Sequence, residues 1–300
     1  MSATAVALAG AGGGPTLSWA VIVAVLCGAL LHAGWNVMVK SGGDKTLDVA
    51  LLAALAGLAA LPVLLVVGLP DAASWPWLAA SLAIHVGYYL TLSEAYRHGD
   101  FGVAYPLMRG TAPCLVALGS GLALGEHLSL GQWLGVGAVA AGVALVGLSR
   151  ARDALAHRRA LAFALANAAI IACYTVVDAR GVRVSGNPLG YAMLHYVGGA
   201  LPFPLLVWLR RGAAGRADLL AYARRRWPVG LLGGMASIGS YSIALWAMTV
   251  APVAAVASLR ESSVLFGAIL GAWLLGERFG VRRMAGAAVI VAGVASLRLG

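Results

Sequence analysis

An arginine lies inside an apolar run that is long enough to cross a lipid bilayer. The run from Phe101 to Glu126 reads FGVAYPLMRGTAPCLVALGSGLALGE, with Arg109 about a third of the way along. A bilayer-spanning helix needs about 20 apolar residues. A charge at this depth costs at least about 2.5–3.5 kcal/mol, so it normally faces a polar cavity or a partner. Pro113 cannot donate to the Arg109 carbonyl one turn earlier, and we expect a helix break beside a water-lined cavity.

The stretch around Arg109 occurs twice in the chain. In one constant register, Arg109 corresponds to Arg260 and the Leu124-Gly125-Glu126 sequence to Leu275-Gly276-Glu277. Repeated matches in one register indicate a duplication. Segments outside this stretch repeat as well: Ala60-Leu61-Pro62 matches Ala200-Leu201-Pro202, and Trp75-Pro76 matches Trp227-Pro228. We therefore expect two homologous halves, residues 16–149 and 159–298.

The apolar runs predict the fold class. Of the 300 residues, 61% are hydrophobic and only 11% charged, which is unlike a soluble globular protein. Five spans in each half is an odd number, so the second half would enter the membrane upside down relative to the first. We predict an all-α integral membrane protein with ten transmembrane helices in two inverted five-helix repeats. The expected spans are 17–39, 48–69, 75–96, 101–124, 131–149, 159–179, 188–209, 227–249, 253–275 and 281–298.

Basic residues predict the orientation of the chain. The formal net charge is +10, but the lysines and arginines stand between apolar runs without interleaved aromatic residues, so no nucleic-acid partner is expected. The positive-inside rule places the richer side in the cytoplasm and both termini outside, with the chain in the inner membrane of the cell. The expected cytoplasmic residues are Lys40, Lys45, Arg97, Arg150, Arg152, Arg158, Arg159, Arg210, Arg211, Arg216, Arg224, Arg225, Arg226, Arg278, Arg282 and Arg283; Arg180, Arg183 and Arg298 face the other side.

Small residues four positions apart recur within the spans. Such pairs let helices approach closely in lipid, where no hydrophobic drive holds them together. They predict a compact bundle, and we interpret them as packing contacts. The pairs are Gly121/Gly125, Gly131/Gly135, Gly230/Gly234 and Gly267/Gly271.

No sequence motif indicates an enzyme or a bound cofactor. The chain has no H-E-x-x-H, no G-x-S-x-G and no phosphate-cradling loop. Cys27, Cys114 and Cys173 are odd in number, and their spacing fits neither a zinc site nor a disulfide framework. We expect no metal, no cofactor and no catalytic residues.

Polar side chains inside the first-half spans are candidates for a substrate site. His32 and Asn36 are one helical turn apart and share a face with Trp35 nearby. Tyr105 and Arg109 are also one turn apart. For His32 and Asn36, pairing with a neighbouring helix is an equal alternative, and for Arg109 the alternative is a structural clamp on unwound carbonyls.

The third span adds another polar face. His85, either Tyr88 or Tyr89, and Tyr96 can line one face of the span, and we take His85, Tyr88 and Tyr89 as candidates for the substrate site. Glu94 lies near the end of the span, where pairing with Arg97 at the membrane interface is the simpler interpretation.

The second half repeats this pattern with a carboxylate added. Arg260 and Glu261 are adjacent and Tyr174 lies in the sixth span, so all three are substrate-site candidates. Adjacent helical residues point about 100° apart, so Arg260 and Glu261 cannot pair face to face. Asp178 is close to Arg180 near a helix end, and we expect it at the membrane interface. Other polar residues in these spans are Asn167, His195 and Tyr196.

The chain resembles the EamA family of the drug/metabolite transporter superfamily. The resemblance is carried by the duplicated half, by LLHAGWNVMVK at Leu30–Lys40, by YPLMRGTAP at Tyr105–Pro113 and by the L-G-E endings. It implies a ten-helix secondary carrier with a central cavity formed by the first, third and fourth spans of each half. It also implies amino acids, their derivatives or other small metabolites as substrates, often exported. Small multidrug members use a carboxylate in their first helix, where this chain has His32 and no Asp or Glu.

These observations predict a secondary transporter, expected to export a small anionic or zwitterionic metabolite by alternating access. Arg109 would hold the anionic group through charge-assisted hydrogen bonds. Candidates for coupling to protons are His32, His85, Glu94 and Glu261. The alternatives are efflux of hydrophobic cations through Glu94 or Glu261, and a membrane-embedded lipid enzyme or scaffold. The partners would be the metabolite, protons and the bilayer, with the protein a monomer or a weak homodimer.

Overall fold

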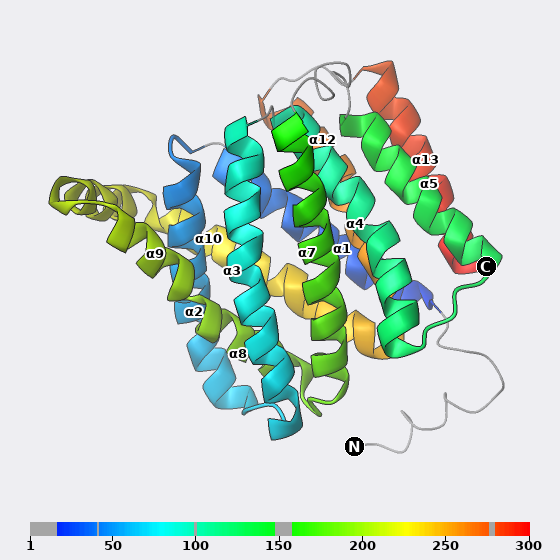
Figure 1. The fold of residues 1–300 in the computed structure, drawn as a ribbon, viewed down its shortest axis with the longest axis horizontal. Coiled ribbons are helices and arrows are strands. Elements are labelled where there is room, and N and C mark those ends of the chain that lie inside the picture. The colour runs from blue at the N-terminus through cyan, green and yellow to red at the C-terminus, as the bar shows by residue number, and fades with distance from the viewer. Residues whose placement is uncertain (1–16, 41, 99–100, 148–157, 276–279) are drawn as a thin grey trace.

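Helices carry nearly all of the chain that the computed structural model describes, which is residues 17–40, 42–98, 101–147, 158–275 and 280–300 (Figure 1). No strand occurs within these ranges. Apolar segments in lipid must satisfy their own backbone polar groups, and helices do so within one segment. The elements are α1 (Trp19–Lys40), α2 (Lys45–Val67), the 3₁₀ turn η1 (Ala72–Ser74), α3 (Trp75–His98), α4 (Phe101–Leu124), α5 (Leu130–Gly147), α7 (Arg158–Arg183), α8 (Pro188–Gly199), α9 (Pro202–Arg210), α10 (Ala213–Val250), α11 (Val253–Arg260), α12 (Ser262–Leu275) and α13 (Val281–Leu299).

Seven helical stretches within the described ranges are long and apolar enough to cross a membrane. The chain is therefore a multi-pass membrane protein. The stretches are Trp19–Val39, Lys45–Val67, Pro106–Leu124, Arg158–Arg183, Pro188–Arg210, Gly215–Val250 and Val253–Leu270.

Three expected spans are helical without belonging to those seven. The span at 75–96 corresponds to α3, whose apolar run is interrupted by polar residues such as His85 and Glu94. The span at 131–149 corresponds to α5, which counts as a shorter apolar helix. The span at 281–298 corresponds to α13, which carries three arginines. The count of ten crossings thus stays a prediction.

The break that Pro113 predicts in the fourth span is absent, and the discontinuity lies in the other half. Helix α4 continues through both Pro106 and Pro113. The corresponding second-half span is divided, because α11 ends at Arg260 and α12 begins at Ser262. A proline removes one hydrogen bond without necessarily ending a membrane helix, since neighbouring helices support the freed backbone.

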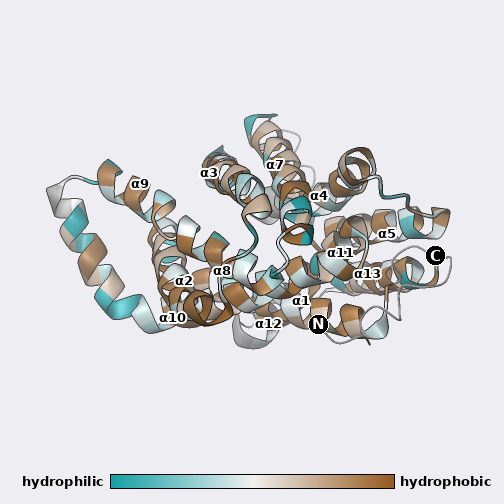
Figure 2. Ribbon diagram, turned by 90° about the horizontal axis from the view of Figure 1, so that it is seen from below, coloured by the Kyte–Doolittle hydropathy of each residue, from teal (hydrophilic) through white to brown (hydrophobic). Residues whose placement is uncertain are grey.

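The basic segment between the seventh and eighth expected spans is part of a long helix. Helix α10 runs without interruption from Ala213 through Pro228 to Val250. Figure 2 shows its hydrophilic first turns projecting beyond the bundle at the left, whereas the later turns are apolar. The expected span at 188–209 is divided into α8 and α9, and α9 begins at Pro202.

Contacts between elements are reciprocal across the two expected halves. Helix α3 packs on α7, and its counterpart α10 packs on α1. In the same way, α4 packs on α7, while α11 and α12 pack on α1. Helix α5 packs on α13, as Figure 1 shows, and α2 on α8. Such exchange is what a pseudo-two-fold relation between repeats produces.

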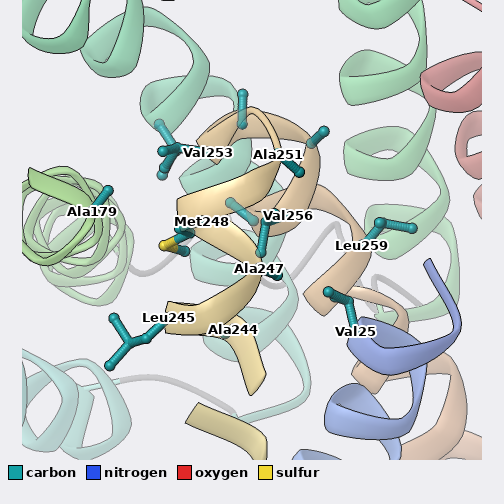
Figure 3. Close-up of a cluster of buried hydrophobic side chains, with 14 of the residues drawn as sticks. Val25, Ala179, Ala244, Leu245, Ala247, Met248, Ala251, Val253, Val256 and Leu259 are labelled. Carbon is teal, nitrogen blue, oxygen red and sulfur yellow. The ribbon is translucent and has the colours of Figure 1, made fainter. Parts of the chain in front are cut away.

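A dense apolar core holds the turn between α10 and α11 (Figure 3). Leu245 and Met248 of α10 are at most 1% exposed, as are Val256 and Leu259 of α11. Val25 of α1 joins them. Because alanines such as Ala244, Ala247 and Ala254 fill the remaining positions, the backbones approach closely. This core fixes the end of α11, where Arg260 lies.

The predicted glycine pairs differ in what they contact. Gly131 and Gly135 face the C-terminal part of α13, and a Cβ at Gly135 would lie 2.9 Å from the Gly293 carbonyl oxygen. Gly230 and Gly234 face α2, where Ala56 backbone lies 3.0 Å from a Cβ built on Gly234. Nothing lies within 4 Å of such an atom at Gly267. Gly125 has a φ of +68° just after α4 ends, a conformation that other residues rarely adopt.

We predict that Gly142→Val destabilises the fold through the contact between α5 and α13. A Cβ at Gly142 would lie 2.8 Å from the Gly286 carbonyl oxygen and 2.9 Å from the Ile290 nitrogen, so the helices must separate. Such overpacking typically costs about 1–3 kcal/mol. Thermal unfolding in detergent should give a lower Tm. Gly137→Val on the same helix is the control, because nothing lies within 4 Å of its Cβ; equal Tm values for the two variants would contradict the prediction.

Candidate functional site

A buried ion pair joins the two expected halves. The Arg109 Nε atom of α4 lies 2.7 Å from Glu261 Oε2, and Arg109 Nη2 donates to Ser263 Oγ at 3.2 Å. Arg109 is 7% exposed and Glu261 4%. The contact between Nε and Oε2 lacks hydrogen-bond geometry, so it is an ion pair. The sequence predicted a guanidinium open to a cavity; the structure instead gives Arg109 a carboxylate partner.

The helix break between α11 and α12 places Glu261 against Arg109. Glu261 donates its backbone N–H to the Ser258 carbonyl at 3.0 Å, and its own carbonyl accepts from Val264 at 3.0 Å. Within the described residues, the hydroxyls of Ser258 and Ser262 are buried without a hydrogen-bond partner. Unsatisfied buried polar atoms cost about 1–3 kcal/mol, and they often mark the position of a ligand or ordered water.

Arg260 differs from Arg109 in having no carboxylate within ion-pair distance among the described residues. Its side chain is half-buried, and the guanidinium lies over the Tyr241 ring at 5.4 Å from the centroid. Its positive charge acts on several surrounding groups from both halves. These are His32, His85, Tyr174, Tyr196 and Tyr241.

The first-span candidates lie together on α1. His32 packs edge-on against Trp35, with ring centroids 5.0 Å apart. Asn36 Nδ2 donates to the His32 carbonyl at 2.7 Å, so the two residues share a face through the backbone of their own helix. The Trp35 Nε1 atom is buried without a hydrogen-bond partner in the described part of the chain. This helix therefore also presents an unsatisfied polar atom.

Aromatic residues of α3 form a continuous set with Tyr174 of α7. The Tyr174 ring centroid lies 4.2 Å from that of His85 and 6.0 Å from that of Tyr88. Tyr88 packs edge-on against Tyr89, which in turn stacks on Phe203 of α9 at 4.7 Å. The structure thus brings together three predicted residues of the third span with the predicted tyrosine of the sixth.

Two further candidates lie outside this group. Glu94 pairs with His98 Nε2 at 3.3 Å near the end of α3, and both side chains are about one-third exposed. The pairing expected for Glu94 was with Arg97, whose side chain lies outside the described residues. The side chain of Tyr105 in α4 also lies outside the described residues.

Asp178 has neighbours that the sequence did not indicate. It was expected at the membrane interface, which stays a prediction, and the structure shows that its side chain is fully buried within the protein. Its Oδ1 accepts from the Tyr191 hydroxyl at 2.8 Å, and its Oδ2 accepts from Ser81 Oγ at 2.8 Å and from the Tyr241 hydroxyl. The available signal was register: Asp178 is one turn after Tyr174, on the face that packs against α3. Those hydroxyl donors stand on three other helices, so the sequence could not place them.

His195 of α8 also belongs to this region. Its ring centroid lies 4.7 Å from that of His85 and 5.3 Å from that of Tyr241. The residue is 8% exposed, and within the described residues its Nδ1 atom has no hydrogen-bond partner. The sequence marked His195 as polar inside a span but gave no indication of these neighbours.

Ion pairs connect the halves at both ends of the bundle. At one end, Glu126 accepts from Arg183 at 2.5 Å and from the Val253 backbone at 2.9 Å. At the other end, Asp48 of α2 pairs with Arg226 of α10 at 3.3 Å, and Asp44, just before α2, pairs with Arg211, just after α9, at 2.9 Å. Each of these ion pairs joins the first half to the second.

The contact with Arg211 influences the pKa of Asp44. Partial burial by itself would raise the pKa of the Asp44 carboxyl. The Arg211 guanidinium and the backbone N–H groups of Leu47 and Thr46 outweigh that effect, so the pKa lies below its usual range. Because the folded-state pKa is lowered, the stabilisation is present at neutral pH and is lost as the pH falls through the folded-state pKa.

Comparison with known proteins decides the family. The model of the EamA-like transporter family matches residues 19–148 and again residues 158–299. The chain belongs to the EamA-like transporter family. It is therefore a membrane transporter of the drug/metabolite type, and the resemblance seen in the sequence is confirmed.

Structural comparison agrees on the fold. A solved structure described only as the crystal structure of a protein has a TM-score of 0.72 to this chain at 18% identity. The match covers 95% of this chain and 99% of the other. No curated protein matches the sequence significantly.

We predict that substitutions at Arg109 and Glu261 have coupled effects on the free energy of unfolding. Arg109→Gln or Glu261→Gln alone leaves a buried charge without its partner, at a cost of about 3–5 kcal/mol. The double variant should lose much less than the sum of the two. Unfolding in detergent measures the three values, with Glu94→Gln, at a more exposed pair, expected to lose only about 0–1 kcal/mol. Additive losses would contradict the coupling.

Proposed function

We propose that this transporter carries a small anionic or zwitterionic metabolite, such as an amino acid or a derivative, and that Arg260 holds the anionic group. The observation that carries the proposal is the half-buried Arg260 guanidinium, which lies over the Tyr241 ring and has no carboxylate partner in the described residues. A cation at membrane depth is costly unless a counter-charge accompanies it. A substrate carboxylate or phosphate would supply this charge through hydrogen bonds that are stronger than neutral ones.

The surroundings of Arg260 fit a small metabolite with one charged end. Tyr174 and Tyr241 are aromatic surfaces against which the rest of the molecule could pack, and His32 with Trp35 offers a further polar wall from α1. Of the residues predicted from sequence, Asn36, His85, Tyr88, Tyr89 and Tyr105 remain proposed lining residues.

Arg109 has a positioning role in this proposal. Its ion pair holds the Glu261 carboxylate against α4. We propose that this contact leaves the Arg260 guanidinium available to a substrate. The sequence predicts that Arg109 binds the substrate directly. We propose instead that Arg109 supports binding by keeping Arg260 available.

We further propose that transport uses ten membrane crossings arranged as two inverted halves, residues 16–149 and 159–298. The two family matches and the reciprocal helix contacts support this arrangement. The ion pairs at the two ends, such as Glu126 with Arg183 and Asp48 with Arg226, are contacts that alternating access would break one end at a time. We also propose export, coupling to protons through His32 or His85, an inner-membrane location with both termini outside, and a monomer or weak homodimer.

Efflux of hydrophobic cations is the alternative within the same family. It would need a carboxylate available to a cationic substrate. Glu261 is paired with Arg109 and Glu94 with His98, so both proposed carboxylates already contact cationic or protonatable groups. The geometry thus favours an anionic or zwitterionic substrate. A lipid enzyme or scaffold would show no solute flux at all.

We predict that Arg260→Ala lowers flux about 10- to 100-fold while the protein still folds, since hydrogen bonds to charged groups contribute about 1.5–3 kcal/mol. A panel of amino acids and small carboxylates, tested in proteoliposomes with and without a pH gradient, first identifies a transported compound. Arg260→Lys keeps the charge and should retain part of the flux. Arg180→Ala, at an exposed arginine near the end of α7, is the matched control and should transport normally.

Two results would count against the proposal. Undiminished flux of the identified anion in Arg260→Ala would remove Arg260 from the site. Transport of charged dyes in place of carboxylates, lost in Glu261→Gln, would favour the cation alternative. A change in Tm for Arg260→Ala is measured in parallel, so that loss of folding is distinguished from loss of binding.

A further inference from the structure

Three side chains with metal-binding atoms meet inside the bundle. His85 of α3, Asp178 of α7 and His195 of α8 form what we call the His–Asp–His cluster. One donor atom from each lies within 4.8 Å of the other two. Asp178 is fully buried and His195 is 8% exposed. Three separate helices thus bring two imidazoles and a carboxylate to one position.

The hydrogen bonding of His85 leaves a lone pair for a metal. Its Nδ1 lies 2.8 Å from the Ser81 carbonyl oxygen, which can only accept, so Nδ1 carries the proton. The neutral ring then has an unprotonated Nε2. Metal-binding histidines usually donate their other N–H to a backbone carbonyl or carboxylate in this way, which fixes the tautomer and the orientation of the ring.

Asp178 is oriented by hydroxyl groups without being saturated. Its Oδ1 accepts a single hydrogen bond, from Tyr191, while Oδ2 accepts from both Ser81 and Tyr241. A carboxylate has about four lone-pair sites, so Oδ1 can still accept a metal bond. The hydroxyls hold the carboxylate in the way that supporting hydrogen bonds hold metal ligands elsewhere.

His195 supplies the independent observation that a ligand belongs here. Its Nδ1 is buried and, within the described residues, makes no hydrogen bond. Leaving a buried polar atom unsatisfied carries a desolvation cost that a ligand would remove. A metal ion bound through Nδ1 would give this atom the partner that it lacks.

We propose that the His–Asp–His cluster binds a divalent transition metal ion, with zinc the best match. Two imidazoles and one carboxylate suit Zn²⁺, Co²⁺ or Ni²⁺, whereas Mg²⁺ and Ca²⁺ prefer oxygen ligands alone. Tetrahedral ligands at about 2.0–2.1 Å from zinc lie about 3.4 Å apart, so donor atoms that are within 4.8 Å of one another must approach by up to about 1.4 Å. Three protein ligands leave a fourth position for water or a solute.

The charge balance sets the strength of this site. Asp178 provides one negative charge, while the positive charge of Arg260 acts on His85. Repulsion from Arg260 makes binding weaker than in a structural zinc site with cysteine ligands. This site does not depend on the proposed function, because it can bind metal whether or not Arg260 holds a substrate.

Metal binding is tested on the full chain in detergent after removal of any affinity tag that contains histidine. Co²⁺ is the probe, since its visible absorption changes when histidine nitrogens replace water. We expect a saturable spectrum with a single ion per chain, which Zn²⁺ displaces and excess Mg²⁺ leaves unchanged. His195→Ala should weaken Co²⁺ binding by more than about tenfold, the lower end of what a metal site loses even when only a supporting residue is changed.

Two variants and one control keep the result interpretable. Asp178→Asn keeps the shape of the side chain and should also weaken Co²⁺ binding. If Asp178→Asn fails to fold, His195→Ala still tests the site, because its Nδ1 makes no hydrogen bond in the described part of the chain that the substitution would break. His127→Ala removes an exposed histidine after α4 and should bind Co²⁺ as the unmodified chain does. Absence of the spectrum, or an equal affinity in His195→Ala and His127→Ala, would overturn the proposal.

Discussion

The buried pairing of Arg109 with Glu261 is the interaction on which the central region depends. It joins the first expected half to the second, and Glu261 lies at the break between α11 and α12. Replacing a buried ion pair by apolar residues is often neutral or stabilising, so such a pair is weak evidence for stability. Its consequence here is positional. With Glu261 turned toward α4, the Arg260 guanidinium lies over the Tyr241 ring of α10 and has no carboxylate within ion-pair distance among the described residues.

The division of the ninth expected span serves the same arrangement. A continuous helix satisfies its own backbone hydrogen bonds and needs no polar surroundings. An interrupted helix does need them. The interruption at Glu261 coincides with unpaired hydroxyls on Ser258 and Ser262, and the apolar core around Met248 and Leu259 fixes its position. In lipid, irregular backbone is tolerated only where protein or a polar cavity surrounds it. The break is therefore informative about where a polar solute would be handled.

The polar residues of the bundle fall into two neighbouring groups with different chemistry. Around Arg260 the groups are cationic and aromatic, which suits an anion. Around Asp178 they are imidazole, carboxylate and hydroxyl, which suits a metal ion. The two groups adjoin, because Tyr241 lies beneath the Arg260 guanidinium and donates its hydroxyl to Asp178. Occupation of one would therefore change the free energy of binding at the other, without direct contact between the ligands.

The sequence by itself determined the helical membrane class, the family and most of the polar positions that matter. Apolar run length and the repeated register carry that information, because each depends on residues close together in the chain or on a fixed offset. Only the tertiary structure decided the partners. It paired Arg109 with Glu261, moved the helix break from Pro113 to Arg260, and buried Asp178 among hydroxyls from three other helices. Those outcomes depend on which faces of distant helices meet, and local periodicity does not encode the crossing of α3 with α7 or of α1 with α10.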